Sequence, residues 1–219
     1  MAEPDARTRI REVALDLFGR HGVRDTSTRE ILNAAGLKNP SAITYHFGSK
    51  AELIEDLVRE LYGGQTPVLQ LQIELVERDG PTSIEAFAAI AVDSAADLIS
   101  NERGCLLARI WWEYSGYVHP DVFEEYLASG NPVTVRWIDA LATTFPDLPR
   151  YVAVARNVTM LRTLEWMIAR RAGRLLTGKP SSALLVDDPE VFRTLMLEVA
   201  VGILSAPTTL TRNDVKFGD

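Results

Sequence analysis

The chain has 219 residues, 47% of them hydrophobic, and its mean hydropathy is zero. A chain of this size can bury a substantial core in one large or two small domains, and its composition excludes an intrinsically disordered protein. The single cysteine, Cys105, excludes an intramolecular disulfide and a thiolate metal site. Its apolar sequence neighbours predict a buried structural thiol.

The net charge of −7 is unevenly distributed along the chain. Residues 1–50 hold eight basic and six acidic residues, whereas the remainder holds 15 basic and 24 acidic residues. A locally positive segment suits contact with phosphate, and an acidic remainder would discourage non-specific coating of DNA. The N-terminus lacks the apolar stretch of a signal peptide, and acidic residues interrupt the apolar segment 84–99. We therefore expect no membrane span and a cytoplasmic location.

Two short helices are predicted near the N-terminus. Residues 6–21 repeat apolar side chains at helical spacing, and Gly22 after them suits a left-handed helix cap. Ser27 and Glu30 have the spacing of a capping box, which begins a second helix that ends at Gly36.

A third helix is predicted directly after this glycine turn. Asn39 is a preferred N-cap and Pro40 suits the first helical position, so the helix body should cover residues 41–47. Ile43 and Phe47 are four residues apart and should face the core. The outer faces of this helix should carry Ser41, Ala42, Thr44 and Tyr45. Two helices joined by a short turn can place the second one in the major groove of DNA.

The rest of the chain shows helical patterns and no convincing strand pattern. A second capping box at residues 49–52 begins a fourth helix, and the Gly- and Pro-containing segment 63–67 is the predicted domain boundary. Residues 179–188 have the composition of a loop, and residues 206–219 that of a disordered tail. Further helices are expected at about 67–78, 82–100, 104–116, 120–145 with a break near 129–132, 147–176 and 189–205.

Within the first 58 residues, several residues occur together at characteristic spacing: Phe18, Gly22, Thr26-Ser27, Glu30-Ile31, Ala35-Gly36, Ala42-Ile43, Tyr45-His46-Phe47, Ser49-Lys50 and Leu53. With them, residues 10–58 resemble the N-terminal domain of the TetR family of one-component transcriptional regulators. The resemblance implies an all-α protein with a helix-turn-helix DNA-binding domain (1–62) followed by a larger helical ligand-binding and dimerisation domain (66–205). It implies a dimeric regulator, most often a repressor that a small ligand releases from a pseudo-palindromic operator.

The resemblance also assigns DNA contacts to individual residues. Ser27 and Thr28 would offer hydrogen-bond donors to a phosphate at a helix start. Tyr45 and His46 would hold the DNA backbone, and Lys50 would contact another phosphate. Such contacts set the register, whereas contacts to bases set the sequence that is recognised. The residues placed at base edges are Lys38, Asn39, Ser41, Ala42 and Thr44.

Two features depart from the family pattern. The interval between Gly36 and Tyr45 is one residue longer than the commonest spacing and includes Pro40. Thr44 stands where an aromatic residue is frequent, and its methyl group could meet a thymine methyl.

The larger domain offers two further candidates. Aromatic residues with polar neighbours could line a ligand cavity, although most of these aromatic side chains are needed for the core. The helices at 147–176 and 189–205 carry more apolar surface than one buried stripe needs, which predicts a homodimer interface. The pocket candidates are Arg109, Trp112, Glu113, Tyr117, Trp137, Asn157, Arg162 and Trp166.

No catalytic or metal-binding constellation is found. The phosphate-loop-like run at residues 173–179 is followed by Pro180, where that motif needs Ser or Thr, and no His has a Glu three or four residues away. We therefore expect no enzyme, cofactor or metal. Two alternatives stay open: a regulator of the same fold that answers to a protein partner or to its own concentration, and, more remotely, a helical enzyme or carrier that uses the aromatic cavity.

Overall fold

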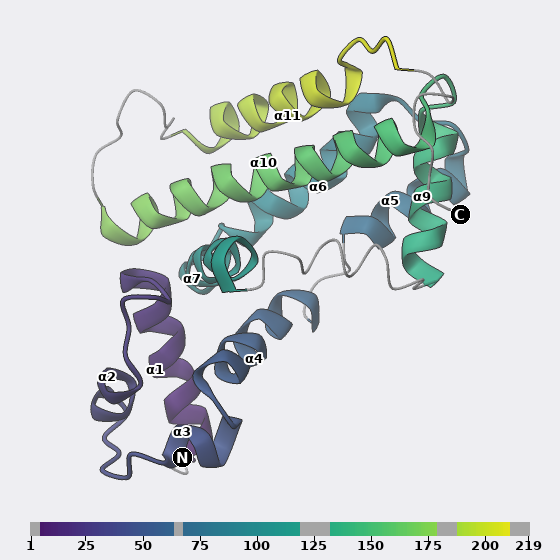
Figure 1. Ribbon diagram of the computed structural model, residues 1–219. Coiled ribbons are helices and arrows are strands. Elements are labelled where there is room, and N and C mark those ends of the chain that lie inside the picture. The colour runs from purple at the N-terminus through teal and green to yellow at the C-terminus, as the bar shows by residue number, and fades with distance from the viewer. Residues whose placement is uncertain (1–4, 64–67, 119–131, 179–187, 211–219) are drawn as a thin grey trace. The chain divides into compact units, whose positions relative to one another are not determined.

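The computed structural model describes residues 5–63, 68–118, 132–178 and 188–210 (Figure 1). These residues form helices, turns and irregular segments without any strand, so the all-α expectation is confirmed. In chain order the helices are α1 (Ala6–His21), α2 (Thr28–Ala34), α3 (Ala42–Phe47), α4 (Lys50–Gly63), α5 (Val68–Asp79), α6 (Ile84–Leu98), α7 (Glu102–Glu113), the π-helix η1 (Tyr114–Val118), α9 (Pro132–Thr144), α10 (Arg150–Thr177) and α11 (Pro189–Ser205).

The helices fall into two compact units. The first contains residues 1–65, 98–123 and 168–180, and the second contains residues 66–97, 124–167 and 181–219. Most of the predicted boundary at 63–67, of the break near 129–132, of the loop at 179–188 and of the tail from 206 lies outside the described residues. None of the described helices combines the length and the apolar character that a membrane crossing needs.

The ends of the first two helices follow their sequence signals. Asp5 caps α1, because its Oδ1 accepts a hydrogen bond of 2.7 Å from the Thr8 N–H. Gly22 ends α1 with a φ of +104°, a backbone conformation that disfavours side chains with a Cβ. Ser27 and Glu30 form the predicted reciprocal capping box. Both helix starts therefore satisfy N–H groups that would otherwise lack partners.

The third helix begins later than predicted. The Asn39 side chain accepts a hydrogen bond of 3.0 Å from the Ser41 N–H, so the chain makes a turn before the helix begins. Ala42, expected on an outer face, is 6% exposed and lies in the core next to Ile43. The prediction for Ala42 was wrong because the buried side of this short helix is wider than the stripe of Ile43 and Phe47 and includes the residue before Ile43.

The start of α4 also differs from the predicted capping box. Ser49 Oγ accepts a hydrogen bond of 3.1 Å from the Glu52 N–H, as expected. The Glu52 carboxylate lies over Gly48, where a Cβ would collide with it, and Gly48 has a φ of +90°. The positive φ favours glycine at this position, whereas the flexible Glu52 side chain could move away from a Cβ.

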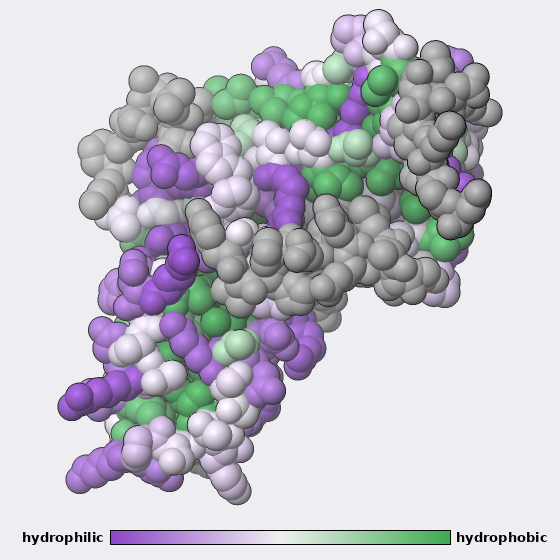
Figure 2. All heavy atoms as spheres, in the orientation of Figure 1, coloured by the Kyte–Doolittle hydropathy of each residue, from purple (hydrophilic) through white to green (hydrophobic). Residues whose placement is uncertain are grey.

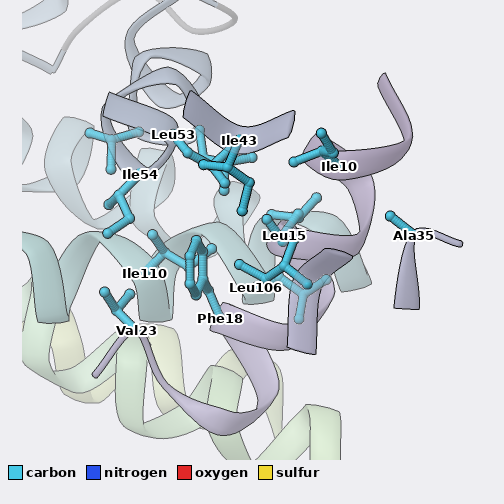
Figure 3. Packing of buried hydrophobic residues seen from close by; sticks show 14 of the residues in the cluster. Ile10, Leu15, Phe18, Val23, Ala35, Ile43, Leu53, Ile54, Leu106 and Ile110 are labelled. Carbon is cyan, nitrogen blue, oxygen red and sulfur yellow. The ribbon is translucent and has the colours of Figure 1, made fainter. Parts of the chain in front are cut away.

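The core of the first unit is built by helices that are distant in sequence (Figure 3). The four N-terminal helices contribute fully buried side chains such as Phe18, Ile31 and Leu53. Helix α7 adds Leu106 and Ile110 to the same cluster, about fifty residues further along the chain. Full burial of one such side chain stabilises the fold by roughly 1.5–3 kcal/mol.

Helix α7 approaches α1 closely at Gly19. A Cβ at Gly19 would lie 2.9 Å from the Leu106 Cα, which is backbone and cannot move alone. Cys105, the neighbour of Leu106, is 2% exposed, and burial raises the pKa of its thiol. The expected buried cysteine is confirmed.

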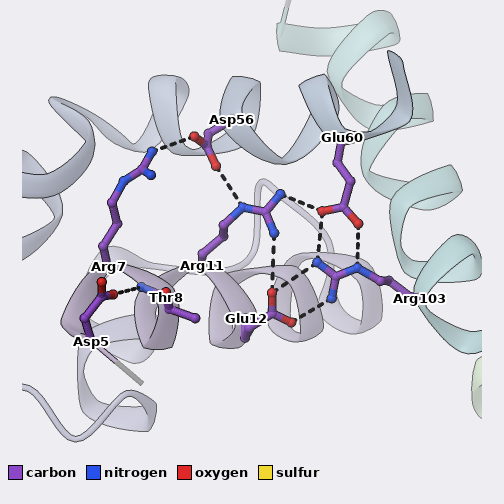
Figure 4. A network of polar contacts seen from close by, with 8 residues as sticks. All are labelled: Asp5, Arg7, Thr8, Arg11, Glu12, Asp56, Glu60 and Arg103. Carbon is purple, nitrogen blue, oxygen red and sulfur yellow. Dashed lines mark hydrogen bonds and ion pairs between the residues drawn. The ribbon is translucent and has the colours of Figure 1, made fainter. Parts of the chain in front are cut away.

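A network of ion pairs joins α1, α4 and α7 (Figure 4). Arg103 on α7 contacts Glu60 on α4 at 2.5 Å and Glu12 on α1 at 2.7 Å. Arg11 on α1 contacts the same Glu60 at 2.5 Å and Asp56 at 2.9 Å. Hydrogen bonds from Arg103 and then Arg11 lower the pKa of Glu60 to about 2. The carboxylate is therefore held in its charged form between two guanidinium groups.

The second unit has a buried polar link between three helices. Trp137 on α9 donates from Nε1 to Gln72 Oε1 on α5 at 3.0 Å. Gln72 in turn donates to the Phe87 carbonyl of α6 at 3.3 Å, and all three residues are fully buried. This arrangement satisfies both groups of the buried amide and fixes the indole ring.

We predict that Gly19→Ala lowers the free energy of unfolding by about 1–3 kcal/mol, because the new methyl group would push α7 away from α1. Gly116→Ala is the control, since nothing lies within 4 Å of a Cβ at that position. It should be neutral or stabilise by up to about 1 kcal/mol. Urea unfolding of both variants measures this, and a Gly19→Ala protein as stable as the wild type would contradict the close contact.

We predict that Arg103→Met destabilises the protein at pH 7 by roughly 1 kcal/mol, a modest value because its ion pairs are partly open to solvent. The pKa of Glu60 is lowered in the folded protein. Its contribution to the free energy of unfolding is therefore complete above about pH 4.5 and is lost as the pH falls from there toward 2. The stability gap between variant and wild type should therefore narrow over that range. Urea unfolding at pH 7, 4 and 3 measures the gap, with Arg78→Met in an exposed pair as control. A gap independent of pH would be the contrary result.

Candidate nucleic-acid interface

Helices α2 and α3 form the helix-turn-helix. Gly36 has a φ of +69° and donates to the Asn33 carbonyl, and Leu37 then donates to the Leu32 carbonyl at 2.9 Å. These two bonds close the end of α2, a common way for a helix to stop at glycine. Leu37 packs against the core, so the next residue, Lys38, is turned to the surface.

The segment that follows this turn presents polar side chains to solvent. Tyr45 is 83% exposed, and its ring meets that of His46 edge-on at 4.9 Å between centroids. The half-buried His46 therefore supports an aromatic side chain that projects from the unit. The other exposed members of the predicted contact set here are Lys38, Asn39, Ser41 and Thr44, while Ala42 is buried.

At the start of α2, Ser27 is already engaged in capping. Its hydroxyl donates to Glu30 Oε2 at 2.7 Å and accepts from the Glu30 N–H at 3.2 Å. The hydrogen bond from the Ser27 backbone lowers the pKa of the Glu30 carboxyl, together with the bond from its hydroxyl. Thr28, the next residue, is exposed.

Lys50 lies at the start of α4 and is half-buried. Its Nζ donates a hydrogen bond of 2.6 Å to the Val23 carbonyl and lies 5.6 Å from the centroid of the Phe18 ring. Burial lowers the pKa of Lys50, while the carboxylates of Asp25 and Glu113 act in the opposite direction. The ammonium is thus held against the turn between α1 and α2.

Four of the eight predicted pocket residues belong to the first unit. Glu113 accepts a hydrogen bond of 2.7 Å from the Val23 N–H, and Arg109 donates to the Arg20 carbonyl at 3.2 Å. Trp112 is half-buried, and the side chain of Tyr117 is not among the described parts of the structure. Arg109 and Glu113 therefore contact the end of α1 and the turn that follows it.

The other four pocket candidates belong to the second unit. Trp137 is fully buried in the link to Gln72, Arg162 pairs with Glu165 at 3.0 Å, and Trp166 is 46% exposed. Asn157 is fully buried, and neither its Nδ2 nor its Oδ1 has a hydrogen-bond partner among the described residues. Native structures contain few such groups.

The ion pairs around Arg103 and the contact of Glu113 with Val23 were not predicted from the sequence. One signal for the first was available: Arg7 and Arg11 on α1 are four residues apart, as are Asp56 and Glu60 on α4. Side chains at that spacing share a helix face, so two such pairs can match. Nothing in the sequence indicated that Glu113 would contact the first turn, because that contact depends on tertiary packing.

Comparison with known proteins agrees with this arrangement. Residues 10–57 match the family described as bacterial regulatory proteins, tetR family. The transcriptional repressor KstR2 of Rhodococcus jostii is 29% identical over 121 residues, 49% of this chain and 59% of that protein. The regulatory protein RaaS of Mycobacterium tuberculosis is 32% identical over 137 residues, 59% of this chain and 58% of that protein. These matches span less than two thirds of either relative.

Solved structures show the same fold over most of the chain. The fatty acid degradation regulator FadR from Bacillus halodurans has a TM-score of 0.55 at 14% identity, over 94% of this chain and 98% of that one. NalD, the secondary repressor of the MexAB-OprM multidrug efflux pump in Pseudomonas aeruginosa, has a TM-score of 0.53 at 20% identity, over 89% and 93%. The family is one of helix-turn-helix DNA-binding regulators, not of enzymes. Residues 10–57 match the N-terminal domain of the tetR family of bacterial regulatory proteins, and these similarities together support a TetR-family regulator.

Proposed function

We propose that the chain is a homodimeric repressor that binds a pseudo-palindromic operator and is released by a small ligand bound in its second unit. The observation that carries the DNA-binding part is the exposed polar face presented by residues 38–45 after the glycine turn. The repressor part is supported by the relative KstR2, which is named a repressor. A cytoplasmic location belongs to the same proposal.

In this proposal, base edges are contacted by Lys38, Asn39, Ser41 and Thr44, which are all exposed. An exposed amide, hydroxyl or ammonium can hydrogen-bond to base edges in the major groove. Ala42 is left out, because its side chain is buried.

The DNA backbone is contacted by Ser27, Thr28, Tyr45, His46 and Lys50. Ser27 uses its hydroxyl for capping, so its contribution comes from its place at the helix N-terminus, where phosphates bind favourably. The Lys50 ammonium has three N–H donors, and one of them is used by the Val23 carbonyl. The remaining N–H donors of Lys50 bind the phosphate in this proposal.

Dimerisation is assigned to α10 and α11. Trp166 on α10 is 46% exposed and Val191 on α11 is 52% exposed. Figure 2 shows apolar side chains at the surface along α11. Large exposed apolar side chains on neighbouring helices mark interaction surfaces, and a two-fold dimer would require a two-fold related operator.

Ligand control is supported by the buried Asn157. Its neighbours on the same face of α10, Ala153, Met160 and Leu164, are apolar and buried. A buried amide group without a partner costs about 1–3 kcal/mol, and a polar group of a bound ligand would remove that cost. A ligand acts by binding more tightly to the conformation that does not fit the operator. The alternative, a regulator of this fold without a small-molecule inducer, gives no role to Asn157.

We predict that Lys50→Ala and Thr44→Ala weaken operator binding in different ways. Loss of Lys50 should weaken binding to all sequences alike and reduce the slope of log affinity against log salt by about 1. Loss of Thr44 should change preference at one base pair, because it removes a base contact. Fluorescence anisotropy measures both effects, with a pseudo-palindromic DNA that the wild type binds and with single-base variants of that DNA.

The control for this pair is Thr143→Ala, an exposed threonine of α9 in the second unit, which should bind as the wild type does. The same loss from Lys50→Ala and Thr44→Ala on every sequence would contradict the division between backbone and base contacts. Operator binding without salt dependence would contradict the phosphate contacts, and no binding of the wild type to any DNA would contradict DNA binding itself.

We predict that Asn157→Leu raises the free energy of unfolding by about 1–3 kcal/mol, because it replaces an unsatisfied buried amide with an apolar side chain of similar size. Compounds from a metabolite library that raise the melting temperature of the wild type and release the operator should no longer act on this variant. Met160→Leu, on the same face of α10, is the control and should keep the response. If no compound releases the wild type, the inducer-free alternative is favoured.

A further inference from the structure

The backbone of Val23, in the turn between α1 and α2, is held at both its N–H and its carbonyl group. Its N–H donates to Glu113 Oε2 at 2.7 Å, and its carbonyl accepts from Lys50 Nζ at 2.6 Å. Val23 itself is 3% exposed. One buried residue therefore connects the last residue of α7 with the first residue of α4.

The geometry around this peptide leaves little freedom. A Cβ at Gly22 would lie 3.1 Å from Glu113 Oε1, so the carboxylate lies directly against the glycine. Thr26 Oγ1 donates to the Gly22 carbonyl at 2.8 Å and closes the other side of the turn. Arg109, one helical turn before Glu113, donates to the last turn of α1. Together these contacts set the direction of the Val23 carbonyl.

We propose that Glu113 is a positioning residue for DNA binding, which acts through Val23 on Lys50. By accepting the Val23 N–H, Glu113 directs the Val23 carbonyl at the Lys50 ammonium and so determines where the remaining N–H donors of Lys50 lie. A side chain held in advance in its binding position loses less freedom when it binds. This inference rests on the proposed phosphate contact of Lys50.

The position of Glu113 in the chain gives this contact a regulatory consequence. Glu113 is the last residue of α7, and the π-helix η1 follows at once with Tyr114. A π-helical turn differs in register from an α-helical turn and is often found at functional sites. A change of register in η1 would therefore move the Glu113 carboxylate directly, and through Val23 it would move Lys50.

The test is a double-mutant cycle on operator affinity with the full-length protein. Glu113→Ala should weaken binding about tenfold, the loss expected for one hydrogen bond to a charged group. Combined with Lys50→Ala, it should cause almost no further loss, because the residue through which it acts is gone. Glu113→Gln should bind like the wild type, because the amide oxygen can accept the same hydrogen bond. Glu85→Ala, an exposed glutamate of α6, is the control and should have no effect.

Several outcomes would overturn the proposal. If Glu113→Ala causes the same loss of operator affinity in the wild type and in the Lys50→Ala variant, the two effects are additive and the link through Val23 is refuted. If Lys50→Ala binds like the wild type, the phosphate contact fails and the inference fails with it. If Glu113→Ala does not fold, Glu113→Asp replaces it in the cycle. The aspartate side chain is shorter, so its carboxylate no longer reaches the Val23 N–H. Binding by Glu113→Asp equal to that of the wild type would then refute the proposal.

Discussion

The close packing of α7 against α1 is the contact on which the first unit depends. Gly19 allows it, because any side chain there would collide with the backbone at Leu106. Leu106 and Ile110 then enter the core, while Arg103 and Glu113 make polar contacts with the N-terminal helices. These four residues are spaced by three, four and three positions, so they form one stripe along α7.

This stripe gives α7 two polar connections to the DNA-binding helices. At one end, Arg103 joins Glu12 of α1 to Glu60 of α4. At the other end, Glu113 accepts the N–H of Val23, the residue whose carbonyl accepts from Lys50. The apolar contact between these ends supplies most of the stability, since partly exposed ion pairs contribute little. The polar groups fix the relative register of three helices.

Prediction from the sequence succeeded where the signal was local. The N-cap of α2 and the glycine that ends α1 were identified because both depend on neighbouring residues. The start of α3 was placed too early, because Asn39 bonds to Ser41 and forms a turn first. Ala42 lies in the core and not on the expected outer face, because the buried side of α3 extends beyond Ile43 and Phe47. The sequence therefore located the segment of candidate base contacts, but it did not show which residues of that segment are exposed.

The sequence by itself determined the all-α class, the helix-turn-helix and the family that residues 10–57 match. These follow from caps, glycines and apolar periodicity, which act over a few residues. Only the tertiary structure showed the contacts of Glu113 and Arg103 and the burial of Asn157. Glu113 was expected in a ligand pocket with Asn157, yet it contacts the first turn, and the two residues belong to different units. Such roles depend on which helix faces meet across long sequence separations, and spacing along one helix carries no information about that.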